Sequence, residues 1–358
     1  MGRALEWAQR GRWGAAPNPM VGCVIVSASG RLLGEGFHQR PGEPHAEIAA
    51  LNQVASGDRG EIPGSTVYVT LEPCAHHGRT PPCADRLVAE RVGRVVVSLL
   101  DPFPAVAGRG LERLRKAGIA VEVGLGAEEA AFQNRRFLHV QRTGRPYVVL
   151  KWAQSADGFM DPRSGAQPGA GMVALTAPAS RRVSHAWRSW EGGILVGGKT
   201  AAIDRPRLDV RDAPGPSPIR FVLDPSGNHL SDADVRANLA PFWHIHQPDT
   251  PVAPGAESLP WTPDEGLPEL LQRIQATTGV LSLLIEGGPT TLSAFIEAGI
   301  WDEIRILTAP KYLGSGLQAP PLPSPLPAPY RTGRADTDAW QCILAPHQPP
   351  PPCGSTSC

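Results

Sequence analysis

The sequence lacks any apolar run near the roughly 18 residues that a helix needs to cross a bilayer, so no membrane partner is expected. It also lacks net charge, because 34 Lys and Arg balance 34 Asp and Glu and the pI is near 7.2. Nucleic-acid enzymes more often carry a basic face, so this balance favours a small-molecule substrate over nucleic acid. The N-terminal residues contain no apolar signal-peptide core, and we therefore expect a cytoplasmic protein.

Cysteine is scarce, with six among 358 residues, which favours metal ligands and isolated thiols over a disulfide framework. Cys23 and Cys342 lie in apolar runs and are expected to be small core residues. Cys353 and Cys358 lie in a Pro-rich tail, residues 345–358, which we expect to be disordered. The two remaining cysteines are therefore the candidates for chemistry.

The composition is that of a folded globular protein, with 41% apolar and 19% charged residues. Gly and Pro, at 39 residues each, stay below the level that indicates disorder. No internal repeat is visible. A chain of 358 residues suggests two or three domains, each large enough to bury its own core.

Helical and strand patterns alternate along the first part of the chain, which predicts a layered α/β domain over residues 1–144. An amphipathic run ends at Gly144, which places the boundary near Gly144–Pro146. The predicted helices are residues 3–9, 46–54, 84–92 and 111–117. The predicted strands are residues 21–27, 32–37, 67–71, 95–100 and 119–123.

A second alternating set predicts another α/β domain over residues 145–344. The segment between Leu230 and Pro260, rich in Pro, Ala and Asp, is expected to be mostly loop. The predicted helices are residues 179–190, 267–277 and 290–298. The predicted strands begin at Tyr147 and cover residues 193–196, 220–223, 242–246, 281–286 and 303–308.

Three residues of the first part form a candidate zinc site: His45, Cys74 and Cys83. One imidazole and two thiolates leave the fourth position of a tetrahedral zinc open for water, as catalytic sites do. Glu47 lies two residues from the histidine and could move protons on that water. His-x-Glu followed by Pro-Cys and a second cysteine is typical of zinc deaminases. Here eight residues separate the cysteines, where the general pattern has two.

That eight-residue insert leaves alternatives open. His76 or His77 could serve as a fourth ligand and close a structural zinc site, although Glu47 would then have no role. Alternatively, His76, His77 and Arg79 could hold a substrate phosphate, or they could form a solvated polar loop.

The motifs Pro17–Gly22, Gly42–Glu47 and Pro73–Cys83 together resemble the bifunctional deaminase/reductase of bacterial riboflavin biosynthesis. The resemblance extends from about residue 2 to about residue 344. It implies a cytidine-deaminase-like α/β/α zinc domain followed by a dihydrofolate-reductase-like α/β domain. It also implies deamination of a diaminopyrimidinone ribotide, with Asn18 binding the pyrimidine edge. A rigid Pro-Asn-Pro turn would explain Asn18 equally well.

The second part contains no G-x-G-x-x-G after a strand, so the Rossmann fingerprint is absent. Two glycine pairs, Gly197-Gly198 and Gly287-Gly288, follow predicted strands and could lie against a phosphate. Such turns are also common for packing reasons alone.

The resemblance implies an NADPH-dependent reductase in this part, with Zn²⁺ and NADPH as the cofactors of the whole chain. It assigns substrate binding to Asn18, His76, Arg188, Leu208, Arg211 and Glu286, with the arginines on the phosphate. It assigns cofactor binding to Gln154, Thr200, Asp204, Gly288, Pro289, Thr290, Thr291, Leu292, Ser293 and Ala294. The oligomeric state is left open, and a homo-oligomer is compatible with the sequence.

Three positions depart from the family pattern. Met172 and Ala174 stand where a serine and a tryptophan are usual, and Pro225 stands where a serine is usual. A lost tryptophan face beside a nicotinamide could cost about 1 kcal/mol of cofactor binding. These departures motivate an alternative, a monofunctional deaminase with an inactive second domain. A nucleic-acid-binding zinc protein is the alternative from another class, and the neutral charge disfavours it.

Overall fold

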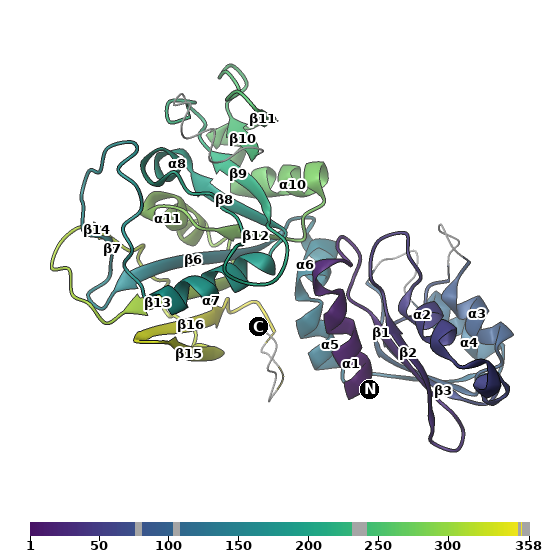
Figure 1. Cartoon of the computed structure of the whole chain (residues 1–358). Helices are drawn as coiled ribbons and strands as arrows, with labels where there is room; N and C mark the ends of the chain where they lie inside the picture. Colours follow the sequence, from purple (N-terminus) through teal and green to yellow (C-terminus); the bar gives the residue numbers. More distant parts are fainter. Residues whose placement is uncertain (76–80, 103–107, 231–241, 350–351, 353–358) are drawn as a thin grey trace. The chain divides into compact units, whose positions relative to one another are not determined.

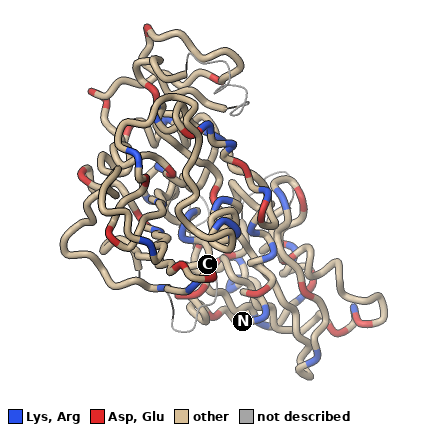
Figure 2. Tube along the Cα trace, turned by 60° about the vertical axis from the view of Figure 1, so that its left-hand side comes forward, with Lys and Arg blue, Asp and Glu red and all other residues tan. Residues whose placement is uncertain are grey.

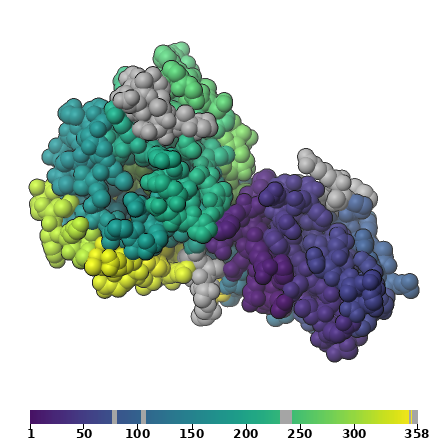
Figure 3. Space-filling model, in the orientation of Figure 1, coloured from purple at the N-terminus to yellow at the C-terminus, as the bar shows by residue number. Residues whose placement is uncertain are grey.

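The computed structural model describes residues 1–75, 81–102, 108–230, 242–349 and 352. They form two compact units, with Met1–Thr143 making up most of unit 1 and Gly144–Pro350 making up unit 2. In Figure 3, Met1–Thr143 runs from purple to blue and the chain from Gly144 runs from teal to yellow. Basic and acidic residues are interspersed along the described trace (Figure 2). Within the described residues, no helix is both long and apolar enough to cross a membrane.

A five-stranded sheet forms the centre of unit 1, in the order β2-β1-β3-β4-β5. β1 is antiparallel to β2 and β3, whereas β3, β4 and β5 are parallel. Leu71 and Leu99 are paired, so the segments after β3 and β4 leave the same edge of the sheet. The strands are β1 (Gly22–Val26), β2 (Leu32–Phe37), β3 (Thr66–Leu71), β4 (Arg94–Leu99) and β5 (Ala120–Val123).

Helices cover both faces of this sheet, with α1 and α5 on one side and α2, α3 and α4 on the other (Figure 1). Glycines in the strands allow close contact: a Cβ at Gly22 would lie 1.9 Å from Ala4 O in α1, and one at Gly34 would lie 2.3 Å from Ala50 O in α2. The helices are α1 (Gly2–Gln9), α2 (Ala46–Gln53), α3 (Cys83–Ala89), α4 (Arg109–Lys116), α5 (Ala127–Gln133) and α6 (Arg135–Thr143), with short 3-10 turns at Arg10–Trp13 and Ser56–Glu61.

A nine-stranded mixed sheet forms the centre of unit 2, in the order β11-β10-β9-β8-β12-β6-β13-β16-β15. The strands from β11 to β13 in this order are parallel, and β16 and β15 complete an antiparallel edge. They are β6 (Tyr147–Ser155), β8 (Gly193–Gly197), β9 (Ile219–Leu223), β10 (Phe242–His246), β11 (Ala256–Pro260), β12 (Ser282–Ile285), β13 (Glu303–Ala309), β15 (Arg331–Ala335) and β16 (Asp338–Leu344). A separate ribbon pairs β7 (Phe159–Asp161) with β14 (Leu317–Gln318).

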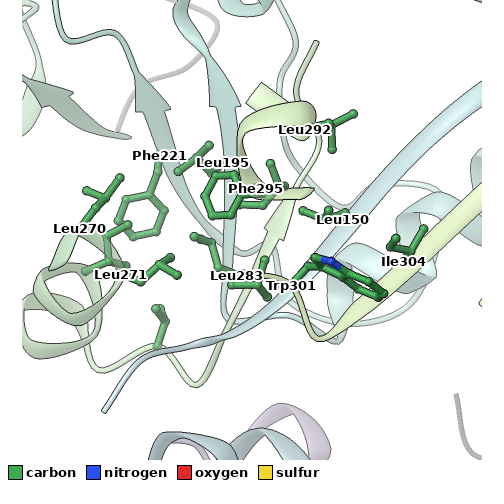
Figure 4. Packing of buried hydrophobic residues seen from close by; sticks show 14 of the residues in the cluster. Leu150, Leu195, Phe221, Leu270, Leu271, Leu283, Leu292, Phe295, Trp301 and Ile304 are labelled. Atoms are coloured by element: carbon green, nitrogen blue, oxygen red, sulfur yellow. The ribbon is translucent and has the colours of Figure 1, made fainter. Parts of the chain in front are cut away.

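Side chains of the central strands alternate between two cores. On β6, Val148, Leu150 and Trp152 pack with α10 (Gly266–Thr278) and α11 (Pro289–Glu297). Figure 4 shows the Phe295 ring of α11 against Leu195, with Leu283, Phe221, Leu270 and Leu271 nearby in the same core. On the opposite face of the sheet lie α7 (Pro178–Ser189), whose Trp187 packs on Leu307 and Cys342, and α8 (Gly198–Asp204), whose Ala201 packs beside Val149.

Most predicted elements are present within one or two residues of their expected bounds, and Cys23 and Cys342 are fully buried, as predicted. The predicted loop between Leu230 and Pro260 was wrong at its end, because residues 256–260 pair in parallel with β10. β15, β16, α8 and the β7–β14 ribbon were not predicted from the sequence. β11 is an edge strand with mostly exposed side chains, so it carries no strong hydrophobic pattern.

The end of unit 2 is fixed by a buried carboxylate at Asp302. It accepts hydrogen bonds from Arg145 Nη1 at 2.7 Å and from the Val148 backbone N–H at 2.7 Å. Gln348 Nε2 also donates to it, at 2.9 Å, and Ala345 is only 2% exposed. Residues 345–348 therefore belong to the folded unit, although the sequence analysis placed them in a disordered tail.

We expect Asp302→Asn to lower the free energy of unfolding by about 3 kcal/mol, because the change leaves Arg145 without its buried counter-charge. Denaturant titration followed by circular dichroism would measure the effect. Glu257→Gln, on the exposed surface of edge strand β11, is the matched control and should change stability by less than about 0.5 kcal/mol. Equal stabilities for the two variants would contradict this role of Asp302.

Candidate active sites

The three candidate zinc ligands lie together in unit 1. His45 is the N-cap of α2, Cys74 follows β3, and Cys83 is the first residue of α3. His45 Nδ1 lies 3.6 Å from Cys74 Sγ and 3.4 Å from Cys83 Sγ, and the three ligand atoms lie within 4.8 Å of one another. Tetrahedral zinc, with bonds of about 2.3 Å to sulfur and about 2.0 Å to nitrogen, separates such ligands by about 3.5 Å. The residues therefore fit the metal.

Backbone contacts orient the two sulfur atoms. The Cys83 N–H donates to Cys74 Sγ at 3.3 Å, and the Ala84 N–H donates to the Cys74 carbonyl at 3.1 Å. Hydrogen bonding by the Cys83 thiol is the main cause that lowers the pKa of Cys74 to about 4. A thiolate at Cys74 is therefore favoured, and thiolates are the form that binds zinc.

Glu47 lies in the first turn of α2 and is 3% exposed. Burial raises the pKa of its carboxyl to about 7, and the negative charge of Cys74 adds to that effect. The positive charge of a bound dication would lower the pKa again. A buried carboxyl with a pKa near neutrality suits a group that must accept a proton and return it.

Asn18 is held by a histidine that the sequence analysis missed. Its Nδ2 donates to His38 Nε2 at 2.9 Å, and His38 Nδ1 in turn donates to the Pro44 carbonyl at 3.2 Å. The His38 ring meets the His45 ring edge-on, 5.4 Å between centroids. Nδ2 carries a second hydrogen and the amide oxygen can accept, so the Asn18 amide can offer either group to a ligand. The available signal was a single histidine directly after β2, shortly before the His-x-Glu motif.

A second missed residue is Glu72, which lies directly before Pro73-Cys74 and is 4% exposed. Its carboxylate accepts N–H bonds from Asp101 at 3.3 Å, Gly108 at 2.9 Å and Gly110 at 3.0 Å. Glu72 thus ties the segment that follows β4 to the one that carries Cys74. His76, His77 and Arg79, the predicted phosphate or fourth-ligand residues, lie outside the described residues.

In unit 2, the predicted substrate residues Arg188 and Glu286 form a two-point ion pair. Arg188 Nε and Nη2 donate to the Glu286 carboxylate at 3.0 and 2.7 Å. Lys151 Nζ lies 3.7 Å from the same carboxylate, and burial lowers its pKa. The sequence analysis missed Lys151, although a lysine inside the apolar run of β6 was a usable signal. Burial alone would raise the pKa of Glu286, but the charges of Arg188 and Lys151 outweigh it and lower the pKa to about 2.

The segment after α8 carries Arg211, a predicted substrate residue. Asp209 in this segment contacts both Arg188 and Arg211. Arg188 Nη1 donates to the Asp209 carbonyl at 3.1 Å, and Arg211 pairs with the Asp209 carboxylate. Leu208 is 1% exposed, packs beside Val149 and Val196, and has a positive φ of 51°.

The two predicted glycine turns lie side by side, because β8 and β12 are parallel neighbours. Gly288 N–H donates to Thr200 Oγ1 at 2.9 Å, which joins the start of α11 to α8. A Cβ at Gly197 would lie 2.6 Å from Thr291 Oγ1, and one at Gly198 would lie 2.7 Å from Asp224 Cβ. The packing alternative therefore accounts for these glycines. The first amides of α11 still have no partner within the helix, which suits an anion.

The other predicted cofactor residues lie on α8, β6 and α11. Asp204 ends α8, and burial, with the charge of Asp161, raises its pKa to about 6. Gln154 accepts a hydrogen bond from Trp152 Nε1 at 2.7 Å. Leu292 faces the core and could offer only its backbone to a ligand. Met172 is 71% exposed and Ala174 is exposed, so neither of these two side chains supplies a buried or aromatic surface.

Unit 1 thus has the layered α/β fold and the His-Cys-Cys cluster of a zinc-dependent deaminase. Residues 1–99 match the model of the cytidine and deoxycytidylate deaminase zinc-binding region, and residues 146–331 match the RibD C-terminal domain. Riboflavin biosynthesis protein RibD of Escherichia coli is 41% identical over 333 residues, covering 88% of each protein. The Aquifex aeolicus protein of the same name is 38% identical over 321 residues, covering 88% of this chain and 87% of its own length.

Solved structures agree with these sequence matches. Acinetobacter baumannii RibD superposes with a TM-score of 0.82 at 35% identity, covering 96% of this chain and 97% of that one. A Thermotoga maritima diaminohydroxyphosphoribosylaminopyrimidine deaminase/5-amino-6-(5-phosphoribosylamino)uracil reductase gives 0.83 at 30% identity, with the same coverage.

The chain belongs to the RibD family of bifunctional riboflavin biosynthesis enzymes. The deaminase and reductase that the sequence predicted are confirmed, and the monofunctional alternative is not supported, because the relatives span both units. Zinc and a nicotinamide cofactor follow from the two domain types.

The lowered pKa of Glu286 predicts an acid-dependent contribution to stability. A carboxyl whose pKa is lower in the folded than in the unfolded protein stabilises the fold at pH values above its unfolded pKa of about 4.5. This contribution is lost as the pH falls towards the folded pKa of about 2. Glu286→Gln should therefore be less stable than wild type by roughly 3 kcal/mol at pH 6 and nearly equal to it near pH 2. Exposed Glu297→Gln is the control. A difference that does not depend on pH would contradict the charge pairing.

Proposed function

We propose that unit 1 deaminates 2,5-diamino-6-ribosylamino-4(3H)-pyrimidinone 5′-phosphate and that unit 2 reduces the product. The first step consumes water and releases ammonia, giving 5-amino-6-(5-phosphoribosylamino)uracil. The second transfers hydride from NADPH to the ribosyl group, giving the ribityl form. The deaminase activity is supported above all by the cluster of one nitrogen and two sulfur ligands from His45, Cys74 and Cys83, with the buried Glu47 beside it.

In the deaminase, His45, Cys74 and Cys83 would hold zinc, which supplies Lewis acidity that lowers the pKa of water to about 7. The Glu47 carboxylate accepts the proton that the water loses and delivers it to the departing amine. Asn18, fixed by His38, would hydrogen-bond the pyrimidine edge through its amide. His76 would add a phosphate contact.

In the reductase, NADPH supplies the hydride when bound, and the chain contributes binding and orientation. Gln154, Thr200, Asp204 and the N-terminal part of α11 with its N-cap, residues 288–294, would hold the cofactor. Arg188 and Arg211 would hold the substrate phosphate, with Glu286 beside the ribose and Leu208 against the ring. The convergence of both arginines on Asp209 supports this assignment.

The metal assignment predicts about one zinc per chain in purified protein, and Cys83→Ala should lose both the metal and ammonia release. Elemental analysis together with an ammonia assay would measure this. Cys23→Ala, a buried cysteine outside the cluster, is the matched control and should keep both. Full zinc content in Cys83→Ala would instead favour the closed site that uses His76 or His77.

Glu47→Gln should retain zinc and the fold but lower the deamination rate by roughly 10²–10⁴-fold, because the amide is similar in shape but cannot shuttle a proton. The variant should still consume NADPH when given the aminouracil ribotide. Ammonia release at the wild-type rate would remove Glu47 from the mechanism.

Arg211→Ala should raise the KM for the aminouracil ribotide about ten- to a hundredfold, since an arginine–phosphate bond is charge-assisted. The KM for NADPH should change little in steady-state assays of NADPH oxidation. Asp204→Ala should show the reverse pattern if that carboxyl faces the cofactor. Equal effects on both KM values would contradict the assignment of Arg211 to the phosphate.

A further inference from the structure

The segment that carries Arg211 is held along one face of α7. Arg181, His185 and Arg188 lie four and three residues apart, so they share that face of the helix. Arg188 Nη1 donates to the Asp209 carbonyl at 3.1 Å. The Arg211 backbone N–H donates to His185 Nδ1 at 3.1 Å. At the N-terminal end of the same face, Arg181 Nε lies 2.8 Å from an Asp212 carboxylate oxygen.

His185 makes the central of these contacts, and the contact fixes its tautomer. A backbone N–H can only donate, so His185 Nδ1 must be the unprotonated acceptor. The ring proton is then on Nε2, which faces Asp212 Oδ2 at 3.6 Å. Arg181 already neutralises this carboxylate, so no second positive charge is required on the imidazole.

The surroundings keep this imidazole neutral. His185 is 2% exposed and lies among the charges of Arg188, Arg211, Asp212 and Glu286. Burial lowers its pKa to about 4, and the two arginines add to the effect. The accepting form of Nδ1 therefore persists throughout the neutral pH range.

We propose that His185 is a positioning residue of the reductase, which fixes the Arg211 segment so that Arg188 and Arg211 present their guanidinium groups to one substrate phosphate. The inference rests on the proposed reductase function and adds a residue to it. His185 acts only through the Arg211 backbone. Its loss should therefore weaken ribotide binding and leave the cofactor site unchanged.

Three substitutions separate positioning from general packing. His185→Asn keeps an acceptor near the place of Nδ1, His185→Gln moves it to the place of Nε2, and His185→Leu removes it. We expect the Gln and Leu variants to raise the KM for the aminouracil ribotide about tenfold, because the partly buried Arg211 N–H loses its hydrogen-bond acceptor. His185→Asn should remain within about threefold of wild type. The kcat and the KM for NADPH should change less than about twofold in all three.

Exposed Arg182→Ala on the same helix is the matched control and should leave every constant unchanged. Ammonia release from the deaminase half reports whether each full-length variant is folded and loaded with metal. Equal ribotide KM values in the Asn, Gln and Leu variants would overturn the proposal, as would a parallel rise in the KM for NADPH. A wild-type chain that consumes no NADPH with the ribotide would overturn the reductase assignment itself.

The tautomer gives a measurement that does not depend on turnover. In ¹⁵N-histidine-labelled protein, the resonances lost in His185→Asn identify this ring. We expect Nε2 to carry the proton and Nδ1 to show the shift of a hydrogen-bonded acceptor between pH 6 and pH 8. A proton on Nδ1 would overturn the proposal even where all variants retain activity.

Discussion

Parallel strands end at the same edge of their sheet, and both candidate active sites depend on this constraint. In unit 1, β3 and β4 are paired from Thr66 to Leu71, so the segments carrying Cys74 and Asp101 leave the sheet together. In unit 2, β8, β12 and β6 are parallel neighbours, so Gly198, Glu286 and Gln154 reach one edge from distant parts of the sequence. Ligand sites of open α/β sheets lie at this edge for the same reason.

Buried charges then fix the elements around each edge. The Glu72 carboxylate accepts hydrogen bonds from the backbone N–H groups of Asp101, Gly108 and Gly110. These bonds fix the path of the chain after β4, beside the zinc ligands. In unit 2, the Asp338 carboxylate accepts the Ala177 N–H at the start of α7. Just beyond its other end, Glu191 pairs with buried Arg305 at 2.8 Å. Since α7 is held at both ends, Arg188 reaches Glu286 in a defined orientation.

Such pairs contribute little net stability, because the desolvation of two charges offsets most of their attraction. Their value lies in specificity, since removing one partner leaves the other buried and uncompensated. Arg188 illustrates the point: it pairs with Glu286 and also holds the Asp209 carbonyl, so the same guanidinium links the end of β12 to the Arg211 segment. The side chains of Met172 and Ala174 are exposed and take no part in these hydrogen bonds of Arg188.

The sequence by itself determined the chemistry of the deaminase. Zinc needs a few specific donor atoms, and His45, Glu47, Cys74 and Cys83 stand in a short, rare pattern that few other functions produce. It also determined most helices and buried strands, because hydrophobic periodicity is a local property. It did not reveal β11 and β15, whose edge positions bury few side chains.

Only the tertiary structure decided which distant polar groups meet. The residues that meet are separated by 20 to 135 positions in the sequence. They are Asn18 with His38, Glu72 with Gly108 and Gly110, Lys151 with Glu286, and His185 with Arg211. Nothing in the local pattern distinguishes these residues from solvated ones, since their partners are chosen by strand order and helix packing. Residues 345–348 show the same limit, because a Pro-rich composition predicts disorder while Asp302, more than forty residues earlier, binds Gln348 and holds the segment in place.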